Sequence, residues 1–199
     1  IRYEELGLLL RFRLRPISVV FALVGIGLLA SLLPRTSFVS QSSGEWVDAI
    51  GPIWPGSAVE QSFEDVPGII SEVRIWAAAA FDRGEAPIVA SLVQRKDDKP
   101  VRQIKVRIKA SKVLQPYVLT FPPYQPVSGD NLVLQLQVST ERKTSVMFGA
   151  SKPREYIEAA TVNHDSVGQG PLAYEVVSRS RGWRAALAGS KADLGRLAG

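Results

Sequence analysis

The chain has 199 residues, 46% of them hydrophobic, which suits one folded domain with a single core plus a shorter segment. It contains no cysteine, and this excludes disulfides, thiol catalysis and thiolate metal sites. The net charge of +5 resides at the two ends, because residues 35–178 hold 15 Lys and Arg against 16 Asp and Glu. A nucleic-acid-binding domain carries its positive charge on a folded face, so the near-neutral middle argues against nucleic acid as a partner.

An apolar run near the N-terminus predicts a membrane anchor. Residues 17–33 carry no charge, and as a helix they would cover about 25 Å, close to the roughly 30 Å hydrocarbon core of a bilayer. Four arginines lie within residues 1–16, whereas only Arg35 follows the run before Arg74. Because the more basic flank stays in the cytoplasm, the rest of the chain is expected on the outer side. We therefore expect a cytoplasmic or interfacial segment at 1–16 and a transmembrane helix at 17–34.

A cleaved signal peptide is the competing interpretation of this run. It requires a short apolar stretch followed by a small-x-small cleavage site, and the residues after Ala30 read SLLPRTSF, without such a site. An uncleaved anchor is the favoured prediction. Because a translocated domain without cysteines suits a bacterial periplasm, we expect a single-pass protein of the bacterial inner membrane, with its N-terminus cytoplasmic and its C-terminal domain periplasmic.

The segment 35–57 is rich in serine, glycine and proline and shows no clear period, which predicts a linker. Trp46 and Trp54 interrupt it. Tryptophan is enriched at bilayer interfaces and at protein–protein hot spots, so both are candidate partner contacts. Packing of the two side chains under the edge of the domain is the alternative.

From residue 58 to 179 the pattern changes to short extended runs separated by turn sequences. Residues 101–110 alternate apolar and basic side chains, and residues 131–139 alternate apolar side chains with glutamines. A period of two indicates strands with one buried and one exposed face, and many such strands predict a mainly β fold, an antiparallel β-sandwich. Nine strands are expected, at 58–64, 69–80, 87–94, 101–110, 115–121, 131–139, 144–151, 156–162 and 171–178.

Several of these strands together resemble a known domain type. The segments are a Q-x-F strand, PGIISEVRIW, VRQIKV, FPPYQPVSGDNLVLQL and, late in the chain, GQGPLAYEV. Over residues 58–179 this order resembles the galactose-binding-like (carbohydrate-binding-module-like) jelly-roll domains of bacterial membrane and envelope proteins. The resemblance implies a jelly-roll fold. Because such domains bind sugars in some proteins and serve as scaffolds in others, it implies no specific ligand residue.

The C-terminal tail, residues 180–199, is basic. It contains Trp183 and Arg184, which are candidate partner contacts. The pattern from Trp183 onward predicts a short helix weakened by two glycines, and we expect the tail to dock on a partner or on the membrane surface. A solvated tail is the alternative.

The sequence shows no catalytic constellation. His164, the only histidine, shares one loop with Asp165 and Ser166, whereas the members of a triad normally come from separate segments. A glycosidase would need two carboxylates across a cleft, which the sequence cannot pair. Zinc and haem lack ligands, and calcium on Asp97 with Asp98, or on Asp130 with Asn131, competes with the role of both pairs in turns. No catalytic residue, cofactor or metal is therefore expected.

Sugar binding would use exposed aromatic side chains. Tyr117, Tyr124 and Trp76 are candidates, of which Trp76 is expected in the core and Tyr124 more exposed. Tyr124 is also a candidate partner contact. The basic side chains of Lys105, Arg107 and Lys109 suit either an anionic partner or a charged outer face that prevents aggregation.

These observations lead to one expected function and one alternative. We expect a non-enzymatic accessory subunit of a larger bacterial membrane complex, such as a photosynthetic reaction centre–antenna or another energy-transducing assembly. Its partners would be the bilayer and other membrane-protein subunits, contacted through the periplasmic sandwich. The alternative is a membrane-tethered carbohydrate-binding module in envelope polysaccharide handling, which requires a concave face with two or more exposed aromatics.

Overall fold

A computed structural model describes residues 35–63, 66–80, 84–127, 131–153, 157–163, 165–166 and 170–181. These residues form a mainly β structure. Its strands are β1 (Arg35–Ser42), β2 (Trp46–Ile53), β3 (Ala58–Phe63), β4 (Ile69–Ala79), β5 (Ala86–Gln94), β6 (Lys99–Ile108), β7 (Gln115–Tyr124), β8 (Leu132–Val138), β9 (Val146–Ser151), β10 (Thr161–Val162), β11 (Asp165–Ser166) and β12 (Tyr174–Arg181).

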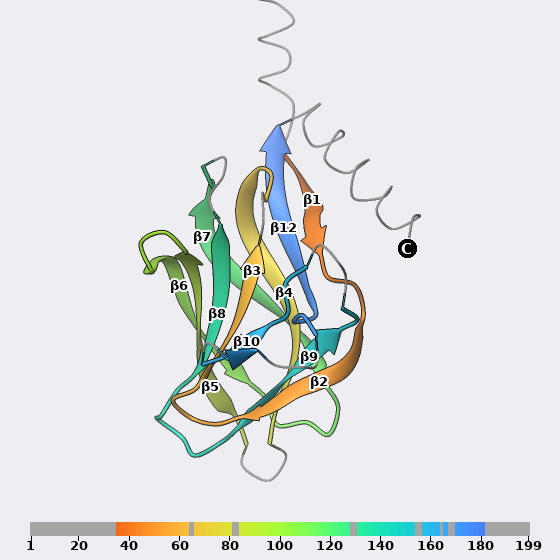
Figure 1. Cartoon of the computed structure of the whole chain (residues 1–199), viewed down its shortest axis with the longest axis vertical. Helices are drawn as coiled ribbons and strands as arrows, with labels where there is room; N and C mark the ends of the chain where they lie inside the picture. Colours follow the sequence, from red (N-terminus) through yellow and green to blue (C-terminus); the bar gives the residue numbers. More distant parts are fainter. Residues whose placement is uncertain are drawn as a thin grey trace, which may run out of the picture.

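The strands form two antiparallel six-stranded sheets. The first sheet, which we call sheet A, has the order β1-β12-β4-β9-β2, with β7 also paired to β4. The second, sheet B, has the order β11-β10-β3-β8-β5-β6. The two sheets lie face to face in a sandwich-like arrangement, visible in Figure 1. The expected antiparallel β-sandwich is confirmed, and the arrangement is compatible with a jelly roll.

The alternation in the sequence correctly assigned the faces of sheet B. On β6, Lys105 and Arg107 are exposed, whereas Ile108 is fully buried. On β8 the four inward-facing residues Leu132, Leu134, Leu136 and Val138 are buried, and Gln137 between the last two is exposed. Apolar side chains on one face of each strand therefore pack toward the other sheet.

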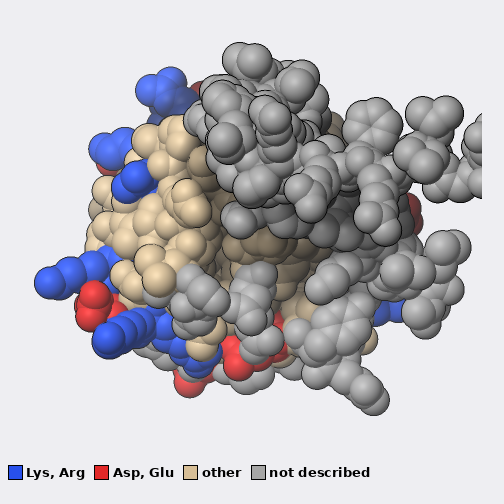
Figure 2. Space-filling view, turned by 90° about the horizontal axis from the view of Figure 1, so that it is seen from above, with Lys and Arg blue, Asp and Glu red and all other residues tan. Residues whose placement is uncertain are grey.

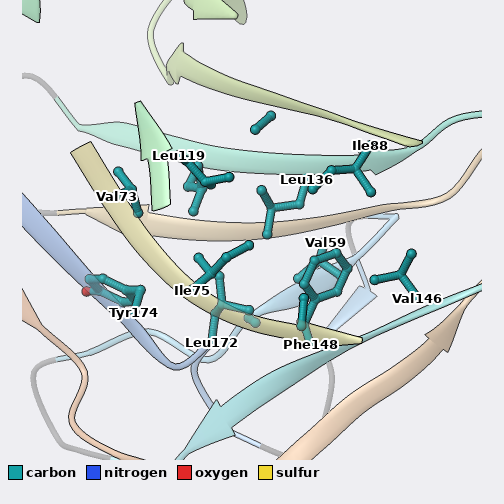
Figure 3. Packing of buried hydrophobic residues seen from close by; sticks show 14 of the residues in the cluster. Val59, Val73, Ile75, Ile88, Leu119, Leu136, Val146, Phe148, Leu172 and Tyr174 are labelled. Carbon is teal, nitrogen blue, oxygen red and sulfur yellow. The ribbon is translucent and has the colours of Figure 1, made fainter. Parts of the chain in front are cut away.

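The core lies between the two sheets. Val73 and Ile75 of β4 pack with Val59 and Leu136 of sheet B, and Figure 3 shows these side chains converging from both layers. The rings of Phe63 and Tyr174 also join the sheets, with centroids 4.8 Å apart. Both side chains are fully buried. This core fixes the relative position of the two sheets and so defines their outer faces.

The interpretation of 35–57 as a linker is wrong. The segment contains β1, which pairs with β12, and β2, which pairs with β9, so both strands belong to sheet A. Ile50 and Ile53 are part of the core. β-bulges in both strands interrupt the period of two, which explains why the segment shows no strand pattern in its sequence. The sandwich therefore begins at Arg35 and not at residue 58.

The sandwich has two distinct ends. At one end, which we call the proximal end, Arg35 of β1 pairs with Arg181 of β12, at the top of Figure 1. The same end carries the residues after β7, because Tyr124 pairs with Ile70 and Ile69 pairs with Arg179. It also carries the turn 95–98, since Gln94 pairs with Leu132 and the Arg95 amide donates to the Asn131 carbonyl just after the β7–β8 connection. The opposite, distal end carries the connections 54–57, 109–114 and 139–145. β4 runs between the two ends, and its 11 residues span roughly 30 Å.

The predictions for both termini concern residues outside the described part of the chain. These are the segment 1–16, the transmembrane helix 17–34, Trp183, Arg184 and nearly all of the tail 180–199. Within the part of the chain that the structure describes, no helix has the length and apolar character needed to cross a membrane.

Candidate docking groove

The outer faces of the two sheets differ in chemistry. On sheet B, polar side chains bond to one another: Gln135 Nε2 donates to Glu60 Oε1 at 2.9 Å, and Gln103 Nε2 donates to Ser91 Oγ at 3.1 Å. On sheet A, apolar side chains cover the distal half of the outer face, including Trp76, Ala78 and Met147. A polar outer face is stable in water, whereas an apolar one is a candidate for contact with another molecule.

A groove opens on this apolar half of sheet A. It has a volume of about 490 Å³, within the size range of ligand and peptide sites. Trp46 and Val113 stand on its walls with 42% and 60% of their surface exposed. Segments far apart in the sequence meet here, namely the start of β2, the end of β4, the connection 111–114 and the start of β9. The lining residues include Trp46, Val47, Pro52, Ala78, Val113 and Met147.

Gly149 explains how the tryptophan side of the groove is built. A Cβ atom at Gly149 would lie 3.0 Å from the Cβ of Trp46 and 3.1 Å from that of Trp76. Since real Cβ contacts are seldom that short, the glycine allows both tryptophans to lie close over β9. Trp76 is half-buried on this outer face, so the expectation that it belongs to the core is wrong. It faces away from the core because from Val73 onward β4 directs its odd-numbered residues, such as Ile75, inward.

Val47 is exposed because of a β-bulge. Trp46 pairs with Ser151 and Asp48 with Ala150, so Val47 between them has no partner on β9. Its side chain is 53% exposed beside the groove. A bulge disrupts the regular ladder of an edge strand, which disfavours the addition of a further strand to β2 at this point. The groove therefore offers side chains rather than backbone as its contact surface.

The structure brings one of the predicted partner contacts to the groove and leaves two others elsewhere. Trp54 is 59% exposed in the connection after β2, at the far end of that strand from Trp46. Tyr124 is half-buried at the proximal end, where the guanidinium of Arg102 lies 5.3 Å from the centre of its ring. Arg102 is fixed there by bonds to the carbonyls of Pro122 and Pro123. Tyr124 is therefore covered on one side by a cation.

The remaining candidates for chemistry lie in turns or in the sheet. The hydroxyl of Tyr117 accepts a bond of 2.7 Å from the Lys109 amide, and its ring packs against the core. The amides of Asp97 and Asp98 both donate to the Gln94 carbonyl, as turn residues do. No group of three or more His, Cys, Asp or Glu side chains suited to a metal occurs among the described residues, which exclude His164 and Asp130.

Sequence reasoning missed Val47, Val113 and Met147 as groove residues. Val47 lay in the presumed linker, and Val113 follows a strand in a short apolar stretch that resembles a buried one. The one sequence feature that pointed to the groove is Trp46, a large aromatic residue in a segment otherwise rich in small residues. The residues around it become neighbours only through the pairing of β2 with β9 and of β9 with β4.

The sequence was also compared with known proteins. No protein-family model matches the chain, and no curated protein shows significant similarity to it.

Proposed function

We propose that the protein is a membrane-anchored, non-enzymatic accessory subunit that binds a neighbouring protein through the groove on sheet A. The observation that carries this proposal is the groove itself, where Trp46, Val47 and Val113 are all more than 40% exposed around an apolar floor. Exposed clusters of this kind are unfavourable in water and typical of protein–protein contact sites. The anchor is supported by the uncharged run at 17–33.

The composition of the groove supports a protein partner over other ligands. Tryptophan and methionine are enriched in the centres of protein interfaces, and both occur here as Trp46 and Met147. Polar groups stand beside the apolar residues, among them Asp48 and Lys112. An apolar centre with charged groups beside it is the usual arrangement of a protein interface.

The carbohydrate-binding alternative is less well supported. A sugar site of the expected type needs two or more exposed aromatic rings on one concave face. Trp46 is the one aromatic side chain among the described residues that line the groove. Trp54 lies at the other end of β2, and Tyr124 is at the opposite end of the sandwich beneath Arg102. Trp76 lies close to Trp46 across Gly149 but is half-buried. Among the described aromatic candidates, Trp46 is therefore the one well-exposed ring on this face, where the expected site needs two.

The first experiment is extraction of the full chain from its native membranes in a mild detergent, followed by size-exclusion chromatography and mass spectrometry. We expect it to co-migrate with a fixed set of membrane proteins. Migration as a monomer with its micelle would contradict the proposal. The composition of the co-migrating set would also identify the complex, energy-transducing or otherwise.

Two matched substitutions connect the result to the groove. Val113→Asp places a charge on the groove wall, and Trp54→Asp places one at a similarly exposed position outside it. We expect the first to abolish co-migration and the second to preserve it, because an unpaired charge buried in an interface is costly. If both variants keep the partners, the groove is not the contact site. Circular dichroism of both proteins verifies that each remains folded.

A further inference from the structure

The chain enters and leaves the sandwich at a single place. Arg35 begins β1 and Arg181 ends β12, and these two residues are direct partners in the ladder of sheet A. Residues 1–34 therefore precede, and residues 182–199 follow, the proximal end of the sandwich. The distal end, with the groove, lies roughly 30 Å away along β4.

The position of the apolar run limits how far the proximal end can lie from the membrane. Leu33 is the last residue of the run, and only Pro34 separates it from Arg35. Two residues of chain reach at most about 7 Å. If the run spans a bilayer, as the proposed function requires, the proximal end must lie at the headgroup layer. The inference below rests on that part of the proposed function.

The chemistry of the proximal end suits such a position. Val127, after β7, is 69% exposed, the largest exposed fraction of any large apolar side chain in the described part of the chain. Lys96 and Lys99 are exposed in and after the β5–β6 turn, and Arg179 is exposed on β12. Figure 2, seen from this end, shows most of the visible Lys and Arg along one side of the surface, with Asp and Glu among them. An exposed apolar residue at an end that also carries cations is a pattern of surfaces that contact anionic lipid.

Two carboxylates in the same turn, Asp97 and Asp98, offset part of this charge, and Glu158 lies 3.4 Å from the guanidinium of Arg95. The attraction of lipid phosphates for this end is therefore moderate. It is sufficient for orientation because the short connection already holds the end at the surface, so that docking carries little further loss of translational freedom.

We infer that the proximal end docks on an anionic lipid surface. Val127 enters the interfacial layer, and Lys96, Lys99 and Arg179 face the lipid phosphates. The long axis of the sandwich then stands away from the bilayer, and the groove is held about 30 Å beyond the headgroups. The partner of the groove is accordingly an extramembrane part of a neighbouring protein, rather than lipid or a transmembrane helix.

The absence of cysteine from the sequence makes a direct test simple. The full chain carrying Val127→Cys, labelled with an environment-sensitive nitrobenzoxadiazole dye, is reconstituted into vesicles of phosphatidylcholine and phosphatidylglycerol in equal parts. Val113→Cys, with a comparable exposed fraction at the distal end, is the matched control. We expect a blue-shifted emission and several-fold stronger quenching by headgroup spin-labelled lipid for the label at 127 than for the label at 113. Equal quenching at the two positions overturns the inference.

A carbonate wash of the same vesicles distinguishes failure of the membrane anchor from failure of the docking. Protein that remains with the vesicles while both labels stay in water contradicts the docking but not the anchor. Protein that is released by the wash contradicts the anchor, and the docking with it.

A charge variant tests the role of the phosphates. Lys96→Gln with Lys99→Gln is expected to reduce the quenching at position 127. Lys105→Gln with Arg107→Gln, on the same edge of the sandwich but farther from the proximal end, is expected to leave it unchanged. An equal effect of the two pairs would show that no specific cation of the proximal end contacts the lipid and would overturn that part of the inference.

Discussion

Trp46 and Trp76 lie on either side of Gly149, so close that a Cβ atom on the glycine would approach the Cβ of each within about 3 Å. The two tryptophans come from β2 and β4, which β9 separates in sheet A. The glycine thus determines how closely the side chains on the outer face of the sheet approach one another. Because Trp46 is part of the groove wall, the shape of the proposed docking surface depends on this single missing side chain.

Gly149→Ala is expected to destabilise the fold by about 1–3 kcal/mol, the usual cost of an overpacked site. The measurement is urea unfolding of the full chain in mild detergent, followed by tryptophan fluorescence. The cost should fall when Gly149→Ala is made in a Trp46→Gly background, because that change removes one of the two opposing Cβ atoms. Strictly additive free energies of unfolding would show that the contact with Trp46 is not the cause.

Phe63→Ala is expected to cost about 3–5 kcal/mol, because it removes a fully buried aromatic ring that packs on Tyr174 between the sheets. This is a large part of the stability of a typical domain. Val118→Ala serves as the control, since Val118 is 54% exposed on the outer face of β7 and should change stability by less than about 0.5 kcal/mol. Similar losses for the two variants would mean that the rings do not form part of the core.

The regular parts of the fold were predictable from the sequence, and the irregular parts were not. Strands β6 and β8 alternate cleanly because each has one buried and one wet face. β7 was expected to stop before Pro122 but continues through Pro123 to Tyr124. The prolines are tolerated there because the pairing of β7 with β4 shifts register between Thr120 and Tyr124, so that Pro122 and Pro123 have no partner on β4 and their missing amide hydrogens break no ladder.

The groove was not predictable in the same way. Trp46 was identified as a candidate contact, but its neighbours Val113 and Met147 are more than 60 residues away in the chain. They meet only because β2 pairs with β9 at one edge of sheet A while the connection after β6 bonds to the end of β4 through Ser111 and Ala79. Tertiary pairing of this kind leaves no periodic signal in any single segment.

Gln61→Leu is expected to destabilise the fold by about 1–3 kcal/mol, the cost of leaving a buried amide without its hydrogen bond. The Gln61 side chain is buried; its Oε1 accepts from the Leu172 amide at 2.8 Å, and its Nε2 donates to the Glu158 carbonyl at 3.1 Å. It thereby ties β3 to Glu158 and to the residues just before β12. Chemical denaturation again gives the free energy of unfolding.

The matched control is Gln137→Leu, the same change at an exposed position on the neighbouring strand β8. It should alter stability by less than about 0.5 kcal/mol. Hydrogen exchange adds a local measurement, since the amide of Leu172 should lose its protection in Gln61→Leu but keep it in Gln137→Leu. Persisting protection in the first variant would show that another group satisfies this amide.

Lys105→Thr with Arg107→Thr is expected to promote self-association while leaving stability nearly unchanged. Both side chains are strongly exposed on β6, the last strand of sheet B, and their ion pairs with Glu141 and Glu85 are long at 3.8 and 3.9 Å. Such surface pairs contribute little to folding, about 0–1 kcal/mol. Charged side chains on an edge strand instead oppose pairing with a second copy, and threonine favours strands. The readout is sedimentation velocity in detergent over a range of protein concentrations.

Lys96→Thr with Lys152→Thr makes the same change in charge outside the strands and should leave the protein monomeric. If both pairs associate equally, net charge rather than protection of the β6 edge controls solubility; if neither does, the basic side chains of β6 are free to serve an anionic partner instead.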